Sequence, residues 1–313
     1  MSPSPEPDFS IVIPTHDRLD VLQEVLAALG AQEGSVSFEV VVVDDGSSDG
    51  TAEFLEHLRP AFPLRVLRQP NQGPAAARNA GVAAARGEWV AFLGDDTVPD
   101  PGWIRAHREA HRRREDPPLR GVLGYTGWHP RLRLSPFLRY INEHGLQFGY
   151  AIIRDPEHVP FNFFYTSNIS LSRRLLLETP FHLDFPYPAW EDIEVGYRLQ
   201  QKGFWIVYEP AARVAHDHPT SFLRFRERQE KAGYSAVVFY RLHPELGPFL
   251  GLGPGGPPPL PSALRQRWLE ILVRGLQNTR LNLPRLWEET LRFHYIRGLQ
   301  RGWRERMGET KEA

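Results

Sequence analysis

The sequence contains no cysteine, which excludes disulfide bonds, thiolate metal sites and thiol nucleophiles. It also lacks an apolar run of about 18 residues, so no segment is expected to span a membrane. Neither a Walker A pattern nor a Gly-x-Ser-x-Gly elbow occurs. Lys and Arg number 37 against 38 Asp and Glu, giving a formal net charge of −1, which argues against nucleic-acid binding through general electrostatic attraction.

The chain is long enough for one large domain, or for one domain with a smaller appendage, at 313 residues. Its hydrophobic fraction of 41% is far above that of a disordered chain. The N-terminal residues Met1 to Pro5 are polar and proline-rich and do not resemble a signal peptide. We therefore expect a cytoplasmic protein with a sizeable core.

Short apolar runs alternate with helical patterns in the first third of the chain. The β-branched run over 38–43 indicates a strand buried on both faces, and the run over 89–93 indicates another buried strand. About twenty residues separate one run from the next, which suits a crossover helix and a parallel pairing. The sequence predicts an α/β fold with helices on both faces of a mostly parallel sheet. The predicted strands cover residues 9–15, 38–43, 64–67 and 89–93, and two predicted helices cover 19–30 and 73–86. A further helix, capped by Asp49 or Ser48, carries Phe54, Leu55 and Leu58.

The rest of the chain is less regular. Residues 127–164 are rich in aromatics, Pro and Arg, and we expect long loops there with a short helix near 137–146. Residues 251–261 form a Pro/Gly linker, and an Arg-rich helical tail over 265–306, broken near Asn282-Leu283-Pro284, follows it. Elsewhere the patterns predict helices over 101–114, after 172, from 193 and over 221–240, and strands over 121–126, 165–172 and 204–208.

Pairs of adjacent carboxylates follow two of the predicted strands. Asp44-Asp45 and Asp95-Asp96 each stand where an apolar run ends, and Asp17 follows the first strand. A turn or a helix cap explains such acids locally. However, parallel strands present their carboxyl ends on one edge of the sheet, so we expect these side chains to gather there. Because adjacent carboxylates repel each other, a divalent cation is the ligand that the arrangement favours.

Other polar residues permit two readings from sequence alone. Glu191-Asp192 stand at a predicted helix N-terminus, where carboxylates are favoured without any function. An ionised carboxylate is also what a general base requires. Arg78 lies either on a solvated helix face or against a phosphate.

Two sets of histidines also stand out. In His216-Asp217-His218 one imidazole of the pair is placed to reach a metal, whereas the alternative is a surface loop. His107 and His111 are expected to be solvated, because Glu109 is misplaced for a zinc-protease helix.

Together these motifs resemble those of the family 2 glycosyltransferases with the GT-A fold. The resemblance covers residues from about 9 to 240, and the tail after about 250 lies outside it. The family's acidic motif often reads Asp-x-Asp, whereas Gly94 occupies the first position here. The matching segments are Ser10 to Arg18, Val41 to Thr51, Arg78 to Gly81, Phe92 to Asp96 and Trp190 to Glu194.

The resemblance implies an inverting enzyme that moves a sugar from a nucleoside diphosphate donor to an acceptor hydroxyl, assisted by Mn²⁺ or Mg²⁺. It implies that Asp192, with Glu191 beside it, supplies the catalytic base. Asp96 and His216 would bind the metal, with the choice between His216 and His218 left open. The nucleotide would contact Pro14, Thr15, Arg18, Asp44, Asp45, Arg78 and Asp95.

The resemblance further implies a division of labour along the chain, with polysaccharide or glycoconjugate biosynthesis as its setting. Residues 1–120 would bind the nucleotide sugar, and 121–245 would hold the base and a carbohydrate or lipid-linked acceptor. Residues 246–262 are the linker and 263–313 the helical tail, which carries eleven Arg or Lys against six Glu. Candidate acceptor contacts are Trp128, His129, His144, Tyr187 and Trp190.

Two alternatives stay open from the sequence. One is a sugar nucleotidyltransferase, although the Ile13 to His16 segment is not the Gly-rich loop that such an enzyme needs. The other is a catalytically silent protein that binds sugar nucleotides at a membrane surface. The tail would then contact lipid on the inner membrane face, or it would pack on the catalytic domain or a second subunit. Its apolar candidates are Trp268, Leu272, Leu276, Trp287, Leu291 and Trp303.

Overall fold

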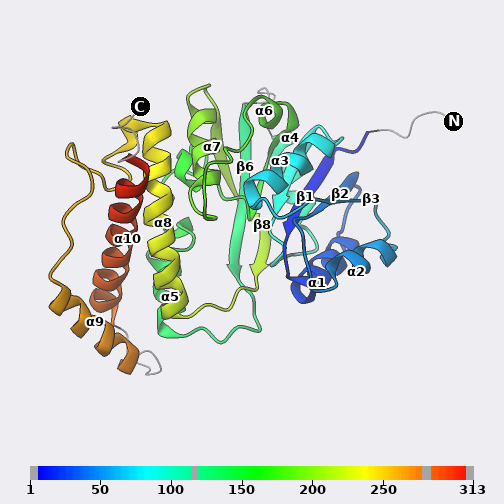
Figure 1. The fold of residues 1–313 in the computed structure, drawn as a ribbon. Coiled ribbons are helices and arrows are strands. Elements are labelled where there is room, and N and C mark those ends of the chain that lie inside the picture. The colour runs from blue at the N-terminus through cyan, green and yellow to red at the C-terminus, as the bar shows by residue number, and fades with distance from the viewer. Residues whose placement is uncertain (1–5, 114–118, 277–282, 308–313) are drawn as a thin grey trace. The chain divides into compact units, whose positions relative to one another are not determined.

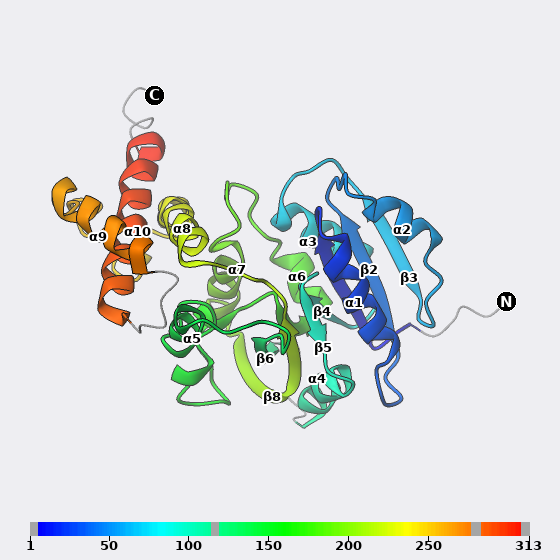
Figure 2. The same ribbon diagram turned by 90° about the horizontal axis from the view of Figure 1, so that it is seen from below.

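The computed structural model describes residues 6–113, 119–276 and 283–307 (Figures 1 and 2). Within it the chain forms two compact units, each described separately below. Unit 1 comprises residues 1–132, 152–182 and 191–218. Unit 2 comprises residues 133–151, 183–190 and 219–313. The functional boundaries at 120, 245 and 262 stay predictions.

Unit 1 is built on an eight-stranded sheet with the strand order β3-β2-β1-β4-β7-β6-β8-β5. Its first half contains the four predicted strands, which are confirmed and pair in parallel. These strands are β1 (Phe9–Thr15), β2 (Phe38–Asp44), β3 (Leu64–Arg68) and β4 (Trp89–Leu93). The apolar side chains of three of these strands, β1, β2 and β4, are largely buried, whereas β3 lies at the edge of the sheet and its Val66 is 40% exposed.

Helices cover both faces of this half-sheet. Ile11 and Ile13 of β1 share a core cluster with Leu22 of α1 (Leu19–Gly30). Val12 lies on the other face, against α3 (Pro74–Ala84), where a Cβ on Gly81 would come within 2.4 Å of the Val12 side chain. Because successive strand residues point to opposite faces, α1 and α3 lie on opposite sides of the sheet. A third helix, α2 (Thr51–His57), connects β2 to β3.

The second half of the sheet differs from the prediction in two strands. β5 (Thr97–Pro99) was not predicted, and it begins directly after Asp96. β8 (Trp205–His216) is much longer than the predicted strand over 204–208. The two strands pair antiparallel, with Thr97 opposite His216. This pairing brings the segment that follows the two acids next to the end of β8.

The remaining strands complete a mixed sheet. β7 (Asn168–Ser172) runs antiparallel to β4 and to β6 (Arg120–Trp128), whereas β6 and β8 are parallel. The helices α4 (Trp103–Arg112) and α6 (Arg173–Glu178) lie within the predicted ranges, and α7 (Glu191–Gln200) begins two residues before the predicted start. Residue 114, the predicted end of the α4 helix, lies outside the described residues. A short 3-10 turn over Phe161–Phe163 lies in unit 1. Another, over Tyr150–Ile152, falls at the boundary between the units, which lies after residue 151.

The prediction that His107 and His111 are solvated was wrong, because α4 packs this face against the sheet. His107 is fully buried, with one ring nitrogen 2.9 Å from Asn168 Oδ1 and the other 2.8 Å from Ser170 Oγ. His111 also contacts Ser170 Oγ, at 2.8 Å. Burial lowers the pKa of His107 to about 4, so its imidazole is neutral in the folded protein.

Unit 2 is helical and contains most of the predicted tail. α8 (Phe222–Leu242) and α10 (Pro284–Met307) lie side by side (Figure 1). Their backbones approach so closely that a Cβ on Gly233 or Gly298 would come within 2.0 Å of a carbonyl oxygen of the other helix. α5 (Pro136–Glu143), α9 (Ala263–Leu276) and a 3-10 turn (Pro244–Leu246) complete the unit. Residue 282, in the predicted break between α9 and α10, lies outside the described residues.

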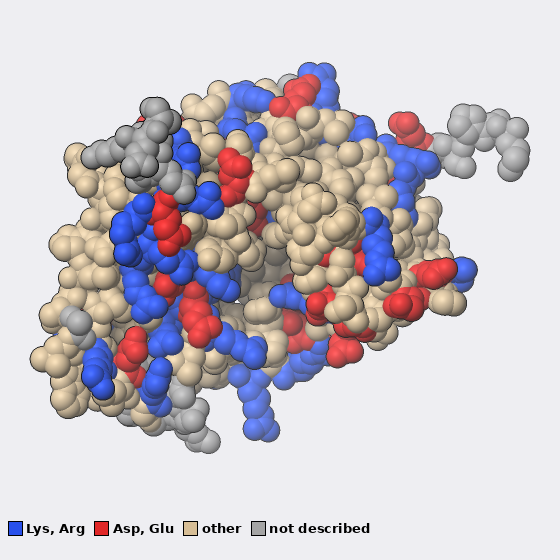
Figure 3. All heavy atoms as spheres, in the orientation of Figure 1, with Lys and Arg blue, Asp and Glu red and all other residues tan. Residues whose placement is uncertain are grey.

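The C-terminal half of the tail, α10, packs against other helices of unit 2. Trp287 is buried in unit 2, where its ring lies 5.5 Å from that of Phe137 and 5.2 Å from that of Tyr140. Figure 3 shows Lys and Arg side chains gathered over α8 and α10, with acidic side chains between them. Among the helices of the described part of the chain, none combines the length and apolar character that crossing a membrane requires.

Candidate active site

The loops at the carboxyl ends of β1, β2 and β4 are tied together, as the sequence predicted for this edge. The backbone N–H of Asp45 donates to the Thr15 carbonyl at 2.9 Å, and that of Asp17 donates to Ser47 Oγ at 3.0 Å. Arg18, in the same loop as Asp17, reaches both acids after β4. The predicted gathering of these acids at one edge of the sheet is thus confirmed in unit 1.

Asp96 lies beside two histidines from the end of β8. Its Oδ2 is 3.5 Å from His216 Nε2 and 3.3 Å from His218 Nδ1. One ligand atom from each of the three residues lies within 4.8 Å of the others. The backbone N–H of Asp217 donates to the Asp96 carbonyl at 2.7 Å, which joins the two loops. A carboxylate and two imidazoles that converge in this way suit a divalent transition-metal ion.

Arg18 supplies the positive charge that the adjacent acids need. Its guanidinium contacts Asp96 and lies 3.3 Å from Asp95 Oδ1. Burial and the Asp96 charge raise the pKa of Asp95 to about 6, against the lowering effect of Arg18. Burial acts in the same direction on Asp96, but hydrogen bonds from His216 and His218 hold its pKa well below the usual range. Asp96 therefore stays ionised, as a metal ligand must.

A second set of contacts holds the histidine loop and was not predicted from the sequence. Asp217 is only 5% exposed and pairs with Arg131, whose other nitrogen lies 2.8 Å from Glu24 Oε2. The backbone N–H of His129 donates to the His216 carbonyl at 3.0 Å. No sequence signal marks these partners, because they are far apart in the chain. About a hundred residues separate Glu24 from Arg131, and more than eighty separate Arg131 from Asp217.

Asp44 and Asp45 are engaged by protein donors at the end of β2. Asp44 is buried and accepts the Ser47 N–H at 2.8 Å. Asp45 accepts the backbone N–H groups of Gln72 and Gly73, at 2.9 and 2.8 Å, and so fixes the loop before α3. Both carboxylates lie at the predicted edge, and their contact with a nucleotide stays a prediction.

Asp192 and Glu191 begin α7, and Arg78 lies against them. Arg78 Nη1 is 2.9 Å from Glu191 Oε1, and its side chain is 13% exposed, so the alternative of a solvated helix face was wrong. Burial and the Glu191 charge raise the pKa of Asp192 to about 6, while Arg78 acts in the opposite direction. Such a pKa places the carboxylate close to the range in which general bases work.

A single short segment connects Asp192 to the acids after β4. The backbone N–H of Thr166 donates to Asp192 Oδ2 at 3.5 Å. The carbonyl of the next residue, Ser167, accepts from the Gly94 N–H at 3.4 Å and from Thr97 Oγ1 at 3.3 Å. The base candidate and the turn that carries Asp95 and Asp96 therefore flank the same two residues.

The candidate acceptor residues divide between the two units. Trp128 belongs to unit 1, where its ring stacks on that of His216 at 5.6 Å. In unit 2, the Tyr187 hydroxyl accepts from Arg301 at 3.1 Å, and Trp190 Nε1 donates to the Ala232 carbonyl at 2.9 Å. His144 Nδ1 lies 3.0 Å from the Tyr140 carbonyl. Their contact with an acceptor stays a prediction.

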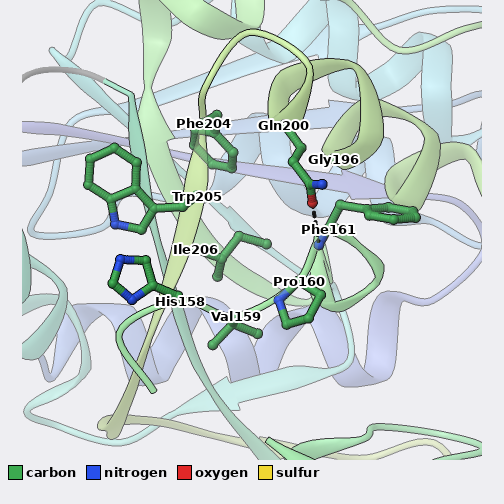
Figure 4. Close-up of a pocket in the computed structure, with 9 residues that line it drawn as sticks. All are labelled: His158, Val159, Pro160, Phe161, Gly196, Gln200, Phe204, Trp205 and Ile206. Carbon is green, nitrogen blue, oxygen red and sulfur yellow. Dashed lines mark hydrogen bonds between the residues drawn. The ribbon is translucent and has the colours of Figure 1, made fainter. Parts of the chain in front are cut away.

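A cavity of about 290 Å³ lies elsewhere in unit 1 (Figure 4). It is lined by apolar and aromatic side chains, and Gln200 Oε1 accepts the Phe161 N–H at 3.3 Å beside it. Trp205 begins β8 and His216 ends it, so the cavity and the metal-ligand cluster are separated by roughly 35 Å of strand. The lining residues are His158, Val159, Pro160, Phe161, Gly196, Gln200, Phe204, Trp205 and Ile206.

This chain is similar in sequence to known glycosyltransferases. Residues 10–116 match the model of "Glycosyl transferase family 2". A chondroitin synthase of Escherichia coli is 27% identical over 257 residues, which cover 74% of this chain and 37% of that protein. A validoxylamine A glucosyltransferase of Streptomyces hygroscopicus is 28% identical over 277 residues, covering 78% and 63%. This chain thus spans less than two thirds of these relatives.

Among solved structures, a mannosyltransferase from Pyrobaculum calidifontis in complex with GDP-Man and Mn²⁺ has a similar fold. The TM-score is 0.65 at 17% sequence identity, and the alignment covers 97% of this chain and 89% of that one. This likeness confirms the predicted fold class, an α/β GT-A fold with a mostly parallel sheet flanked by helices.

Proposed function

We propose that this chain transfers a sugar from a nucleoside diphosphate donor to an acceptor hydroxyl, because its residues 10–116 match the glycosyl transferase family 2 model. The observation that carries the proposal is the convergence of Asp96, His216 and His218 at the edge of the sheet, with Arg18 and Asp95 beside them. A donor of this type carries a diphosphate, which a divalent cation and a guanidinium both neutralise.

Asp96, His216 and His218 would hold the metal ion. Two imidazole nitrogens in the ligand set favour Mn²⁺ over Mg²⁺, which prefers oxygen ligands, and the mannosyltransferase of similar fold was solved with Mn²⁺. When bound, the ion supplies positive charge that stabilises the diphosphate leaving group. The Arg131 to Asp217 pair would keep the histidine loop in place for this purpose.

The nucleoside would lie along the edge formed by the ends of β1 and β2. Pro14 and Thr15 would contact the base, and Asp44, Asp45 and Asp95 would accept hydrogen bonds from base N–H groups and ribose hydroxyls. Carboxylates suit this task because an ionised carboxylate only accepts. Arg18 would turn from the two acids toward the diphosphate as the metal binds.

Asp192 would act as the general base. Its carboxylate takes the proton of the acceptor hydroxyl, the acceptor oxygen bonds to the anomeric carbon, and the bond from that carbon to the diphosphate breaks. A single displacement from the opposite face inverts the configuration. Glu191 and Arg78 would act through Asp192, because they set its pKa in opposite directions.

We propose a carbohydrate or lipid-linked acceptor, in keeping with relatives that are named for carbohydrate products. Trp128, His144, Tyr187 and Trp190 remain the candidate contacts, and a cytoplasmic location stays a prediction. The family match favours glycosyl transfer over nucleotidyl transfer and over a silent binding protein.

Donor binding tests the proposal directly. We expect one class of nucleoside diphosphate, and its sugar derivatives, to raise the melting temperature in the presence of Mn²⁺, because a ligand bound only to the folded state stabilises that state. Asp96→Ala should abolish the Mn²⁺-dependent part of the shift. If no nucleoside diphosphate shifts the wild type, or if the variant responds equally, the assignment of the site is wrong.

A further inference from the structure

Helix α9 exposes an apolar stripe that no described part of the chain covers. Leu264, Trp268, Ile271 and Leu272 are 70%, 61%, 54% and 48% exposed. Their spacing of four, three and one residues places them on one face at 3.6 residues per turn. Of the eleven large apolar side chains exposed in the described residues, these four share a single helix. We call these four residues the α9 stripe.

The opposite face of α9 is attached to the rest of unit 2. Glu270 Oε1 lies 3.4 Å from His294 Nε2 of α10 and 3.8 Å from Arg226 Nη1 of α8. Glu270 is the only acid between Ala263 and Leu276. The helix therefore turns its negative charge inward and its apolar side chains outward.

Cations border the stripe on both sides. On a helical wheel Arg267 and Arg274 lie along one side of the stripe, and Arg265 lies along the other. In Figure 3 the surface at the lower left, over α9, is largely tan, with blue side chains at its border. The outer face of α9 is thus an apolar strip with Arg267 and Arg274 along one margin; on the other margin Arg265 pairs with Glu289 at 3.0 Å.

Only some of the apolar tail residues that the sequence suggested for membrane contact are exposed in the structure. Trp268 and Leu272 belong to the stripe, whereas Trp287 and Leu291 are buried in unit 2. The ring of Trp303 lies against Gly256 and Tyr240. The side chain of Leu276 lies outside the described residues. Lipid contact through α10 is therefore not supported, and α9 is the part that remains.

We infer that α9 docks the protein in the plane of an anionic lipid surface, with the stripe inserted among the acyl chains. Helices of this kind combine an apolar face with Lys or Arg at its margins, and Trp favours the interfacial depth. Arg side chains extend from the margins to the negative headgroups. A second copy of this chain fits less well, because pairing two stripes would bring the rows of Arg together.

The inference does not depend on the proposed function, since vesicle binding needs no donor or acceptor. The full chain is sedimented with vesicles of phosphatidylcholine alone, and with vesicles that also contain phosphatidylglycerol. We expect binding to the anionic vesicles, weakened by salt. Trp268→Ser/Leu272→Ser should reduce this binding at least tenfold, because most of the inserted apolar surface is lost. Arg267→Ser/Arg274→Ser should reduce it about thirtyfold.

Leu183→Ser is the matched control, because Leu183 is 61% exposed in unit 2 but lies outside α9. It should bind like the wild type, and all variants should melt like the wild type because the altered side chains are exposed. Equal binding to neutral and anionic vesicles would overturn the inference. So would unchanged binding of the stripe variant, or a dimer in solution that this variant dissociates while no vesicle binds.

Discussion

The pH dependence of turnover should follow Asp192. Its pKa of about 6 is set by burial and by Glu191, and is opposed by Arg78. Because a base must be ionised, the rate should rise with pH through about 6 and level off above it. At pH 5 it should be about a tenth of the plateau value, as expected for one ionising group.

Substitutions at Asp192 and at its two charged neighbours should change the rate and move the pH profile in defined directions. Asp192→Asn removes the base and should lower the rate by about 10²- to 10⁴-fold, or roughly 3 to 5 kcal/mol of activation free energy. Glu191→Gln removes a like charge, so the rise should move to lower pH. Arg78→Met removes an opposite charge, so the rise should move to higher pH. These opposite shifts separate Asp192 from Asp95, whose pKa is also raised to about 6.

The assay is the release of nucleoside diphosphate from the donor that stabilises the protein, measured from pH 4.5 to 8 (roughly the range in which carboxylates and imidazoles titrate). Donor affinity is measured in parallel and should survive in Asp192→Asn. Full activity of that variant would refute the base assignment. A rise that stays at the same pH in both neighbouring variants would refute the account of its pKa.

Two further predictions concern stability. The pKa of His107 is about 4 in the folded protein and near 6.5 when solvated, so its contribution to stability is complete above pH 6.5 and is lost as pH falls toward 4, by about 3 kcal/mol. Urea unfolding at several pH values should show this loss in the wild type and in the exposed control His57→Gln, but less of it in His107→Gln. Arg131→Gln leaves the buried Asp217 carboxylate without its guanidinium and should cost about 1–2 kcal/mol, since Arg131 is half exposed. It should also weaken Mn²⁺ binding in calorimetry, whereas equal affinity in Arg131→Gln and Arg133→Gln would show that the pair does not position the histidines.

The parts of the fold that were predictable are those with local causes. β1 to β4 follow from apolar runs, which are rich in β-branched residues in β1 and β2, and the crossover lengths favour their parallel pairing. β5 could not be predicted, because a three-residue strand exists only through its pairing with β8, more than a hundred residues away. The burial of His107 was missed for the same reason, since its polar partners Asn168 and Ser170 lie on a distant strand.

In the candidate site, too, the features with a local sequence signal were predictable and those that depend on distant contacts were not. An apolar run that ends in Asp95-Asp96 is a local signal, and so is the His216 to His218 spacing. That both histidines face Asp96 depends on the length of β8 and on its register with β5. The Arg131 to Asp217 pair and the contact of Arg78 with Glu191 join distant segments and leave no pattern in the sequence.

The central claim is that a divalent cation held by Asp96, His216 and His218 supports transfer from a nucleoside diphosphate sugar. It is tested most directly by measuring nucleoside diphosphate release from the donor found by thermal shift, with Mn²⁺ and with chelator, in wild type and Asp96→Asn. We predict release by the wild type with Mn²⁺, and release at the background rate in chelator and in the variant. Equal release with Mn²⁺ and with chelator, or no release from any donor that binds, would contradict the claim.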